Sequence, residues 1–225
     1  MKKKASRKEA KRLRAPASPF ALTIGHSTRP LDEFIALLQA HEVTCVVDVR
    51  TIPRSRHNPQ FNSESLPGSL KRAGIGYIHL AGLGGLRRTS KTSPNTGWRN
   101  ASFRGFADYM QTPQFEGALA QLLELGQQAR PALMCAEAVP WRCHRSLIAD
   151  ALLARGIQVG HIMSRAAAKP HTLTPFAKVR GTQITYPPEG PTAPLPPELC
   201  PKRLSCGHGV HTPTRRRAKS LGWSR

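Results

Sequence analysis

The chain has 225 residues, of which 34 are Lys or Arg and 13 are Asp or Glu, giving a formal net charge of +21. This length allows one sizeable domain with a hydrophobic core, and five irregularly spaced cysteines do not indicate a disulfide framework. Without a run of about eighteen apolar residues or an N-terminal apolar segment, we expect a cytoplasmic protein with no membrane partner.

Much of the charge belongs to the two ends of the chain. Residues 1–19 hold eight basic residues and one acidic residue, and residues 166–225 hold ten basic and two acidic residues. We expect a basic disordered tail at 1–19, one α/β domain at 20–188 and a Pro-rich, basic irregular tail at 189–225. Such tails either raise the affinity for a polyanion, nucleic acid first, or serve only as solubilising segments.

The expected domain begins with a short apolar strand at residues 21–24, which His26 and Ser27 follow. Apolar residues at helical spacing then predict a helix that ends near residue 40. The β-branched run at 43–49 is typical of a strand that is buried on both faces.

Two long loops follow, at residues 51–62 and 81–102, and between them lie a short helix and a third strand at 75–80. Loops of this length inside a compact domain are usually functional or disordered. They carry a group of side chains that either grip a polyanion, with the tryptophan stacking on a base, or are simply solvated. This group is Arg54, Arg56, Arg87, Arg88, Arg99 and Trp98.

The C-terminal half continues the alternation. Helices are predicted at 103–110 and 115–125, a strand at 131–135, a helix that opens at Cys143, and a fifth strand at 157–163. This pattern predicts an α/β fold with an open, mainly parallel five-stranded sheet flanked by helices. The remainder of the chain is expected to be mostly irregular.

Polar, titratable side chains stand at the carboxyl ends of all five predicted strands. Because right-handed crossovers bring these ends to one edge of a parallel sheet, we expect them to share one ligand-binding crevice. They are His26 and Ser27, Asp48 and Arg50, His79, Cys135 and Glu137, and His161.

The sequence Cys143-His144-Arg145 is the strongest chemical motif. A thiol at a helix N-terminus beside arginine predicts a reactive thiolate or an oxyanion pocket; the alternative is that Cys143 only packs against the sheet. Glu137 is either an acid, base or nucleophile, or else a cap or a partner of Arg145. Asp48 is either catalytic or only orders its loop.

These arguments give two sets of candidate residues. The predicted catalytic set is Cys143, Glu137, His144, Cys135, His26 and Asp48. The predicted substrate-binding set is Ser27, Arg50, Arg145, His79, Gly84 and Gly85. The two glycines belong to a Gly-rich stretch whose backbone amides would wrap a phosphate. No Walker loop or dinucleotide fingerprint occurs, so neither ATP nor NAD is indicated and the cofactor stays unknown.

Two groups of side chains are candidate metal ligands. They are Cys135, Glu137, Cys143 and His144, and, near the C-terminus, Cys200, Cys206, His208 and His211. Neither group has the cysteine spacing of a zinc ribbon or zinc finger, so the sequence assigns no metal site.

Several motifs occur together in this chain. They are Thr23-Ile24-Gly25-His26-Ser27-Thr28, Asp48-Val49-Arg50 with Pro53, Ser55, Pro59 and Phe61, Tyr77 with His79, Leu83-Gly84-Gly85, Cys135-Ala136-Glu137 with Cys143-His144-Arg145, and residues 171–177. This combination, over about residues 20–188, resembles the family catalogued as domain of unknown function 488. The resemblance implies an α/β fold and a shared site, and it does not specify a reaction.

Three functions are compatible with these patterns. The leading hypothesis is an enzyme acting on an anionic, nucleotide-like or nucleic-acid substrate, in which Cys143 or Glu137 reacts and His144 or His26 moves protons. The second is a non-catalytic module that binds a phosphorylated ligand or nucleic acid in the same pocket. The third is a metal-dependent protein. The sequence does not indicate an oligomeric state.

Overall fold

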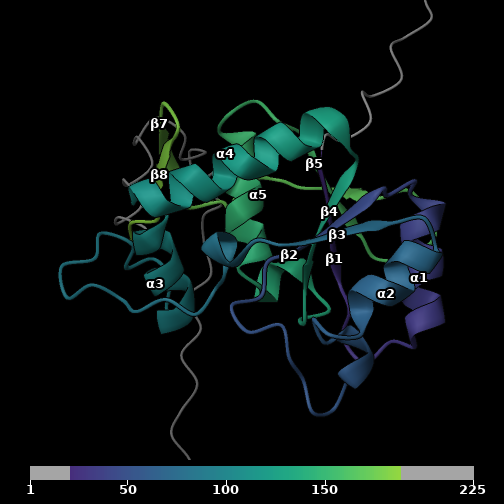
Figure 1. Cartoon of the computed structure of the whole chain (residues 1–225). Helices are drawn as coiled ribbons and strands as arrows, with labels where there is room; N and C mark the ends of the chain where they lie inside the picture. Colours follow the sequence, from purple (N-terminus) through teal and green to yellow (C-terminus); the bar gives the residue numbers. More distant parts are fainter. Residues whose placement is uncertain (1–20, 189–225) are drawn as a thin grey trace, which may run out of the picture. The chain divides into compact units, whose positions relative to one another are not determined.

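Six strands form one sheet within residues 21–188, the part of the chain that the computed structural model describes (Figure 1). The strands are β1 (Ala21–Gly25), β2 (Cys45–Asp48), β3 (Gly76–His79), β4 (Pro131–Cys135), β5 (Val159–Ile162) and β6 (Lys169–Pro170). Their order is β3-β2-β4-β1-β5-β6, and all neighbours are parallel except β5 and β6. The predicted α/β class with a mainly parallel sheet is therefore confirmed.

The predicted strand count of five is wrong by one, because β6 was not expected. This edge strand has two residues, and Pro170 lacks the N–H that a longer ladder would need. The segment after β6, expected to be irregular, also forms a hairpin of β7 (Lys178–Arg180) and β8 (Gln183–Thr185). The predicted tails and the C-terminal Cys/His group lie outside the described residues.

Helices cover both faces of the sheet (Figure 1). The helices α1 (Leu31–Ala40) and α2 (Leu66–Arg72) pack on one face, and α3 (Ala101–Tyr109), α4 (Pro113–Gln128) and α5 (Arg145–Leu153) pack on the other. Successive strand residues serve opposite layers: Val46 packs with the first group and Val47 with the second. This explains the continuous apolar run at β2.

The start of α5 differs from the prediction. A single 3-10 turn, Pro140–Arg142, precedes Cys143, whose amide donates to the Pro140 carbonyl at 3.0 Å. Cys143 is consequently extended, with φ −134° and ψ 144°, and the helix begins at Arg145. The thiol therefore lies just before the helix and not in its first turn.

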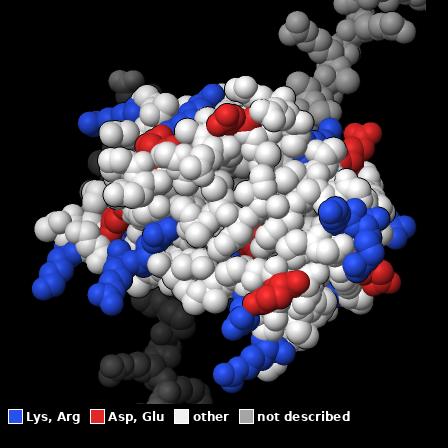
Figure 2. Space-filling model, in the orientation of Figure 1, with Lys and Arg blue, Asp and Glu red and all other residues white. Residues whose placement is uncertain are grey.

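Within the described range, no helix combines the length and the apolar character needed to cross a membrane. On the face seen in Figure 2, Lys and Arg lie in several separate groups with Asp and Glu between them. This face therefore does not present one continuous basic surface.

The order of the strands creates a crevice at one edge of the sheet. Strand β4 lies between β1 and β2, and the chain leaves β1 and β2 toward the face of α1 and α2. It leaves β4 toward the face of α5. Neighbouring parallel strands whose connections diverge in this way leave a ligand-binding crevice at their carboxyl ends.

Candidate functional site

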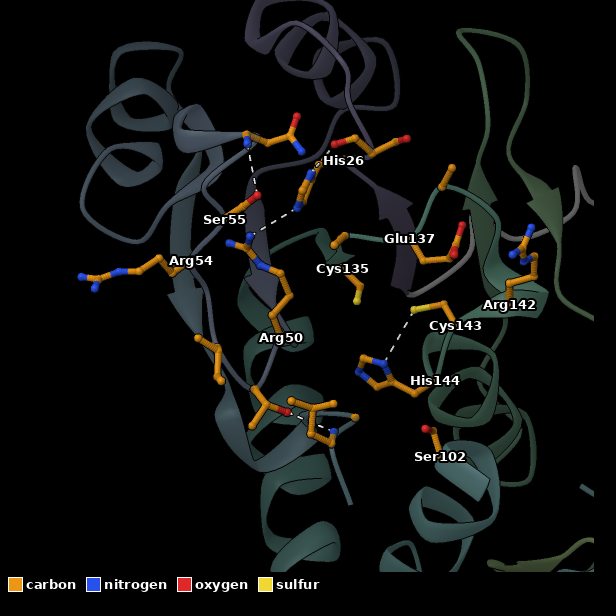
Figure 3. Close-up of a pocket in the computed structure, with 18 of the residues that line it drawn as sticks. His26, Arg50, Arg54, Ser55, Ser102, Cys135, Glu137, Arg142, Cys143 and His144 are labelled. Atoms are coloured by element: carbon orange, nitrogen blue, oxygen red, sulfur yellow. Dashed lines mark hydrogen bonds between the residues drawn. The ribbon is translucent and has the colours of Figure 1, made fainter. Parts of the chain in front are cut away.

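A cavity of about 770 Å³ lies at the carboxyl ends of β1, β2 and β4 (Figure 3). Its volume is within the range of small-molecule sites. Among the residues predicted from the sequence, those that line the cavity are His26, Ser27, Arg50, Gly85, Cys135, Glu137, Cys143 and His144. The predicted residues outside its lining are Asp48, His79, Gly84, Arg145 and His161, so the expectation that all five strand ends share this crevice is wrong for His161. The topology therefore brings most of the candidates together.

Cys143 is at the centre of the site and is only 4% exposed. The Nδ1 atom of His144 lies 3.7 Å from its Sγ atom, and Nε of Arg145 donates to the same sulfur at 3.3 Å. A hydrogen bond from the Cys135 thiol, supported by His144 and Arg145, holds the pKa of Cys143 well below its usual range, although burial acts in the opposite direction. The same hydrogen bond raises the pKa of Cys135. The directions of the two pKa shifts favour a thiolate at Cys143 and a thiol at Cys135.

A backbone carbonyl fixes the ring of His144. Its Nε2 atom lies 3.0 Å from the Val49 oxygen, and because a carbonyl only accepts, Nε2 must carry a proton. In the neutral ring, Nδ1 then faces Cys143 with a free lone pair and can receive the thiol proton. Phe106 packs edge-on against the ring, with centroids 5.1 Å apart. A Cβ atom at Gly85 would lie 2.5 Å from Nδ1, so only glycine leaves room for this ring position.

Arg145 is 1% exposed, and no carboxylate in the described part of the chain forms a salt bridge with it. Its two other contacts are neutral: the Thr23 hydroxyl at 3.4 Å and the Glu137 carbonyl at 2.5 Å. A guanidinium stays protonated when buried, and an isolated buried charge is costly. The Cys143 thiolate provides the nearby negative charge that Arg145 otherwise lacks.

Asp48 is fully buried and supports Arg50 from behind the cavity. The Arg50 guanidinium pairs with its carboxylate at 2.6 Å and also donates to the Phe61 carbonyl at 2.6 Å. The Tyr77 hydroxyl donates to the same carboxylate at 2.9 Å. These contacts occupy the Asp48 carboxylate inside the protein, where it holds the Arg50 side chain in place.

His26 is also held on both sides of its ring. Nδ1 donates to the Ser27 carbonyl at 2.8 Å, and Nε2 lies 3.2 Å from a nitrogen of Arg50. Phe61 stacks on the ring with centroids 4.2 Å apart. Burial lowers the pKa of His26 to about 4, so the ring is neutral near pH 7. His26 therefore orients Arg50 at the wall of the cavity.

His79 and Gly84 support the site from outside. His79 is exposed on the edge strand β3, and its Nε2 lies 2.8 Å from the Arg50 carbonyl. Gly84 is buried, and its amide donates to the Ala81 carbonyl at 2.9 Å, so this amide is not free to bind a phosphate. A Cβ atom at Gly84 would lie 2.5 Å from Oγ1 of Thr51. The glycine thus permits close packing of two loops.

Trp98 does not present a free face for a base. Its ring packs against Phe103, Phe176 and Tyr186, with centroid distances of 4.7, 4.9 and 5.5 Å. Arg87 lies over an aromatic ring of α3 at 3.6 Å from the centroid. These two side chains of the second long loop are used inside the protein.

Several cavity residues were not predicted from the sequence. Most are polar residues of the loops: Thr28, Thr51, Ser55, Asn58, Asn100 and Ser102. Ile52, Leu86 and Phe103 add apolar surface, and Arg142 adds charge. Loop length was the only signal for them, because hydroxyl and amide side chains in loops have no distinctive spacing. Arg54, which the sequence placed in the group that would grip a polyanion, also lines the cavity.

The sulfur atoms of Cys135 and Cys143 and the Nδ1 atom of His144 all lie within 4.8 Å of one another. Figure 3 shows both sulfur atoms beside the imidazole. These three residues belong to the group that the sequence offered as metal ligands, and Glu137, its fourth member, is not part of the cluster. Three ligands are fewer than the four of a structural zinc site, and Arg145 donates to one of the sulfur atoms, so the arrangement favours thiol chemistry over a structural metal site.

The fold and the cavity define an α/β protein with helices on both faces of a parallel sheet and a thiol-centred pocket at the carboxyl edge. The family model described as "Domain of unknown function DUF488" matches residues 30–152, more than half of the chain. The chain therefore belongs to this family. No curated protein and no solved structure matches it. The matched range includes Cys135 and Cys143 and excludes His26.

Proposed function

We propose that the protein is an enzyme in which the Cys143 thiolate attacks a small anionic, nucleotide-like substrate. The observation that carries the proposal is the contact of Cys143 Sγ with the buried Arg145 Nε at 3.3 Å. The thiolate is the nucleophilic form of cysteine, and an adjacent base completes the activated nucleophile. Here that base is His144 Nδ1, at 3.7 Å.

The proposed reaction uses these groups in two steps. In the reactive form, His144 Nδ1 holds the proton that the Cys143 thiol has given up, and the thiolate Sγ donates an electron pair to an electrophilic carbon or phosphorus of the substrate. The leaving group departs with the electrons of the broken bond and takes the proton from His144. Water then attacks the group left on Sγ and gives its proton to His144, and the S–C or S–P bond breaks to return the Cys143 thiolate. Cys135 donates its hydrogen bond to the thiolate before the attack.

The lining of the cavity supports the substrate class. Its many hydroxyl and amide side chains suit a hydroxyl-rich ligand, and Arg142, which is exposed and has no salt bridge among the described residues, suits an anionic group. Ile52 and Leu86, 65% and 69% exposed, offer apolar surface for a planar group. A nucleotide combines these three properties.

A non-catalytic module for the same ligands is the second candidate. The polar lining of the cavity favours this binding module as much as it favours an enzyme. Only a reactive Cys143 thiolate would distinguish the enzyme from the module. A small ligand is favoured over an extended nucleic acid, because the site is a cavity of about 770 Å³, within the range of small-molecule sites.

Alkylation with a charged and a neutral reagent tests the proposal. We expect iodoacetate to react with Cys143 faster, relative to iodoacetamide, than it does with free cysteine. Arg142→Gln should reduce the iodoacetate rate about fivefold, which corresponds to about 1 kcal/mol between charges 4 Å apart in water. Arg180→Gln, on the β7 hairpin outside the cavity, is the matched control and should change neither rate. Peptide mass spectrometry identifies the modified cysteine.

Protection experiments then separate the candidates. Inorganic phosphate and adenosine monophosphate should slow alkylation of Cys143, whereas no protection and a rate ratio equal to that of free cysteine would contradict an anionic substrate. If these ligands slow the alkylation of Cys143 but the thiol reacts no faster than a free cysteine, the result would support the binding module. Stronger protection by a single-stranded oligonucleotide than by the mononucleotide would point to nucleic acid.

A further inference from the structure

Helix α5 carries two opposite charges, Arg145 and Asp150, which are 1% and 0% exposed. No salt bridge joins them, and every residue from Arg145 to Leu152 is buried. Neither charge can therefore be satisfied by bulk water. Each depends on hydrogen bonds from neighbouring side chains.

Three side chains connect the two charges. Arg145 donates to the Thr23 hydroxyl at 3.4 Å, and this oxygen lies 2.8 Å from His161 Nδ1. His161 Nε2 lies 3.0 Å from His171 Nδ1, and His171 Nε2 lies 2.9 Å from the Asp150 carboxylate. Thr23 and His161 are register partners on β1 and β5, so the sheet itself sets the middle of this chain of contacts.

The hydrogen bonds run in one direction when both imidazoles are neutral. The Asp150 carboxylate only accepts, so His171 donates from Nε2 and accepts at Nδ1 from His161. His161 then accepts at Nδ1 from the Thr23 hydroxyl, whose oxygen accepts from Arg145. Burial lowers the pKa of His161 to about 4, which favours its neutral form near pH 7.

We propose that Thr23, His161, His171 and Asp150 are positioning residues that hold Arg145 against the Cys143 thiolate. The negative charge of Asp150 polarises the neutral groups between it and Arg145, so that Thr23 presents an oriented oxygen to the guanidinium. Thr23 holds one terminal nitrogen of Arg145 and the Glu137 carbonyl holds the other, so the Nε atom stays in contact with the Cys143 sulfur. The inference rests on the proposed function, because it concerns the reactivity of that thiolate.

Asp150 has further hydrogen bonds that are not part of the series that leads to Arg145. It accepts from the Thr174 amide at 3.0 Å, from the Thr174 hydroxyl at 2.7 Å and from the Tyr186 hydroxyl at 2.9 Å. These contacts attach the segment after β6 to α5. Removal of the Tyr186 hydroxyl therefore takes one hydrogen bond from Asp150 and leaves every hydrogen bond between Asp150 and Arg145 in place.

The pair Thr23→Val and Tyr186→Phe tests the proposal, because each removes one buried hydroxyl and keeps the side-chain shape. Thr23→Val should raise the midpoint of the pH profile of Cys143 alkylation by about one unit, making alkylation below the midpoint about tenfold slower. Tyr186→Phe should leave the profile unchanged, and both variants should lower the melting temperature. The groups facing Cys143, which are Cys135, His144 and Arg145, are retained in both proteins.

A second measurement does not depend on the thiol. Nitrogen NMR of the histidine rings should show the Nε2–H tautomer at both His161 and His171. An Nδ1–H tautomer at either ring would show that the proposed series of hydrogen bonds from Arg145 to Asp150 does not exist. A low wild-type midpoint that Thr23→Val does not move, or that Tyr186→Phe moves equally, would overturn the positioning role alone. If the wild-type Cys143 alkylated with the pH profile of a free cysteine, the proposed function would be overturned. The tautomers of His161 and His171 would still show whether the series of hydrogen bonds from Arg145 to Asp150 exists.

Discussion

Arg145→Met should abolish the fast alkylation of Cys143 at mildly acidic pH. Methionine keeps much of the apolar stem and removes the cation, so the buried thiolate loses its counter-charge. An opposite charge at this range shifts a pKa by about 1–3 units, and the midpoint of the alkylation profile should rise by that amount. The rate of iodoacetamide labelling at Cys143, followed across pH by peptide mass spectrometry, measures the shift.

Arg155→Met is the control for this experiment. Arg155 follows the same helix, forms a salt bridge with Glu116 at 2.7 Å and does not line the cavity. Its replacement should lower stability and leave the profile of Cys143 in place. If Arg145→Met folds, as judged by circular dichroism, and also keeps the wild-type profile, the thiolate does not depend on Arg145.

Asp48→Asn should lower the free energy of unfolding by about 3–5 kcal/mol, because removing one member of a buried ion pair leaves the other charge uncompensated. Arg50 would be that charge, since it is 6% exposed and pairs with Asp48 at 2.6 Å. Urea unfolding of both proteins measures the difference.

Glu64→Gln provides the comparison for Asp48→Asn. It breaks the exposed Arg54–Glu64 pair, which also has a 2.6 Å contact, and should have little effect because solvent screens such pairs. If the two variants were equally stable, Asp48 would not be the residue that compensates Arg50. Another group would then have to compensate the buried charge of Arg50 at the wall of the cavity.

The main elements of the fold could be predicted because they depend on local patterns. The β-branched run at β2 and the apolar run at β4 are each buried on both faces, and such runs need no knowledge of their neighbours. Strand β6 could not be predicted, because two exposed residues that include a proline carry no periodicity. The 3-10 turn before Cys143 was missed for a similar reason, since one turn leaves no repeating pattern.

The candidate site was predictable where topology decides position. His26 follows β1 and Cys135 ends the neighbouring parallel strand β4, and both line the same cavity. The sequence left two roles open for Asp48 and placed Arg145 both beside the Cys143 thiol and in the substrate-binding set. Only the folded structure shows that both side chains are buried and lie outside the lining of the cavity. Asp150 was missed as well, although a carboxylate inside an otherwise apolar helical run is a usable signal of a buried polar network.

The most direct test of the central claim is the ultraviolet absorbance of the thiolate, measured as the difference between the wild-type protein and Cys143→Ser across pH. We expect the difference to be fully present at neutral pH and to persist well below the value of about 8.5 at which a free thiol titrates. A difference that appears only as the pH rises through about 8.5 would show an ordinary thiol at Cys143 and would contradict the account.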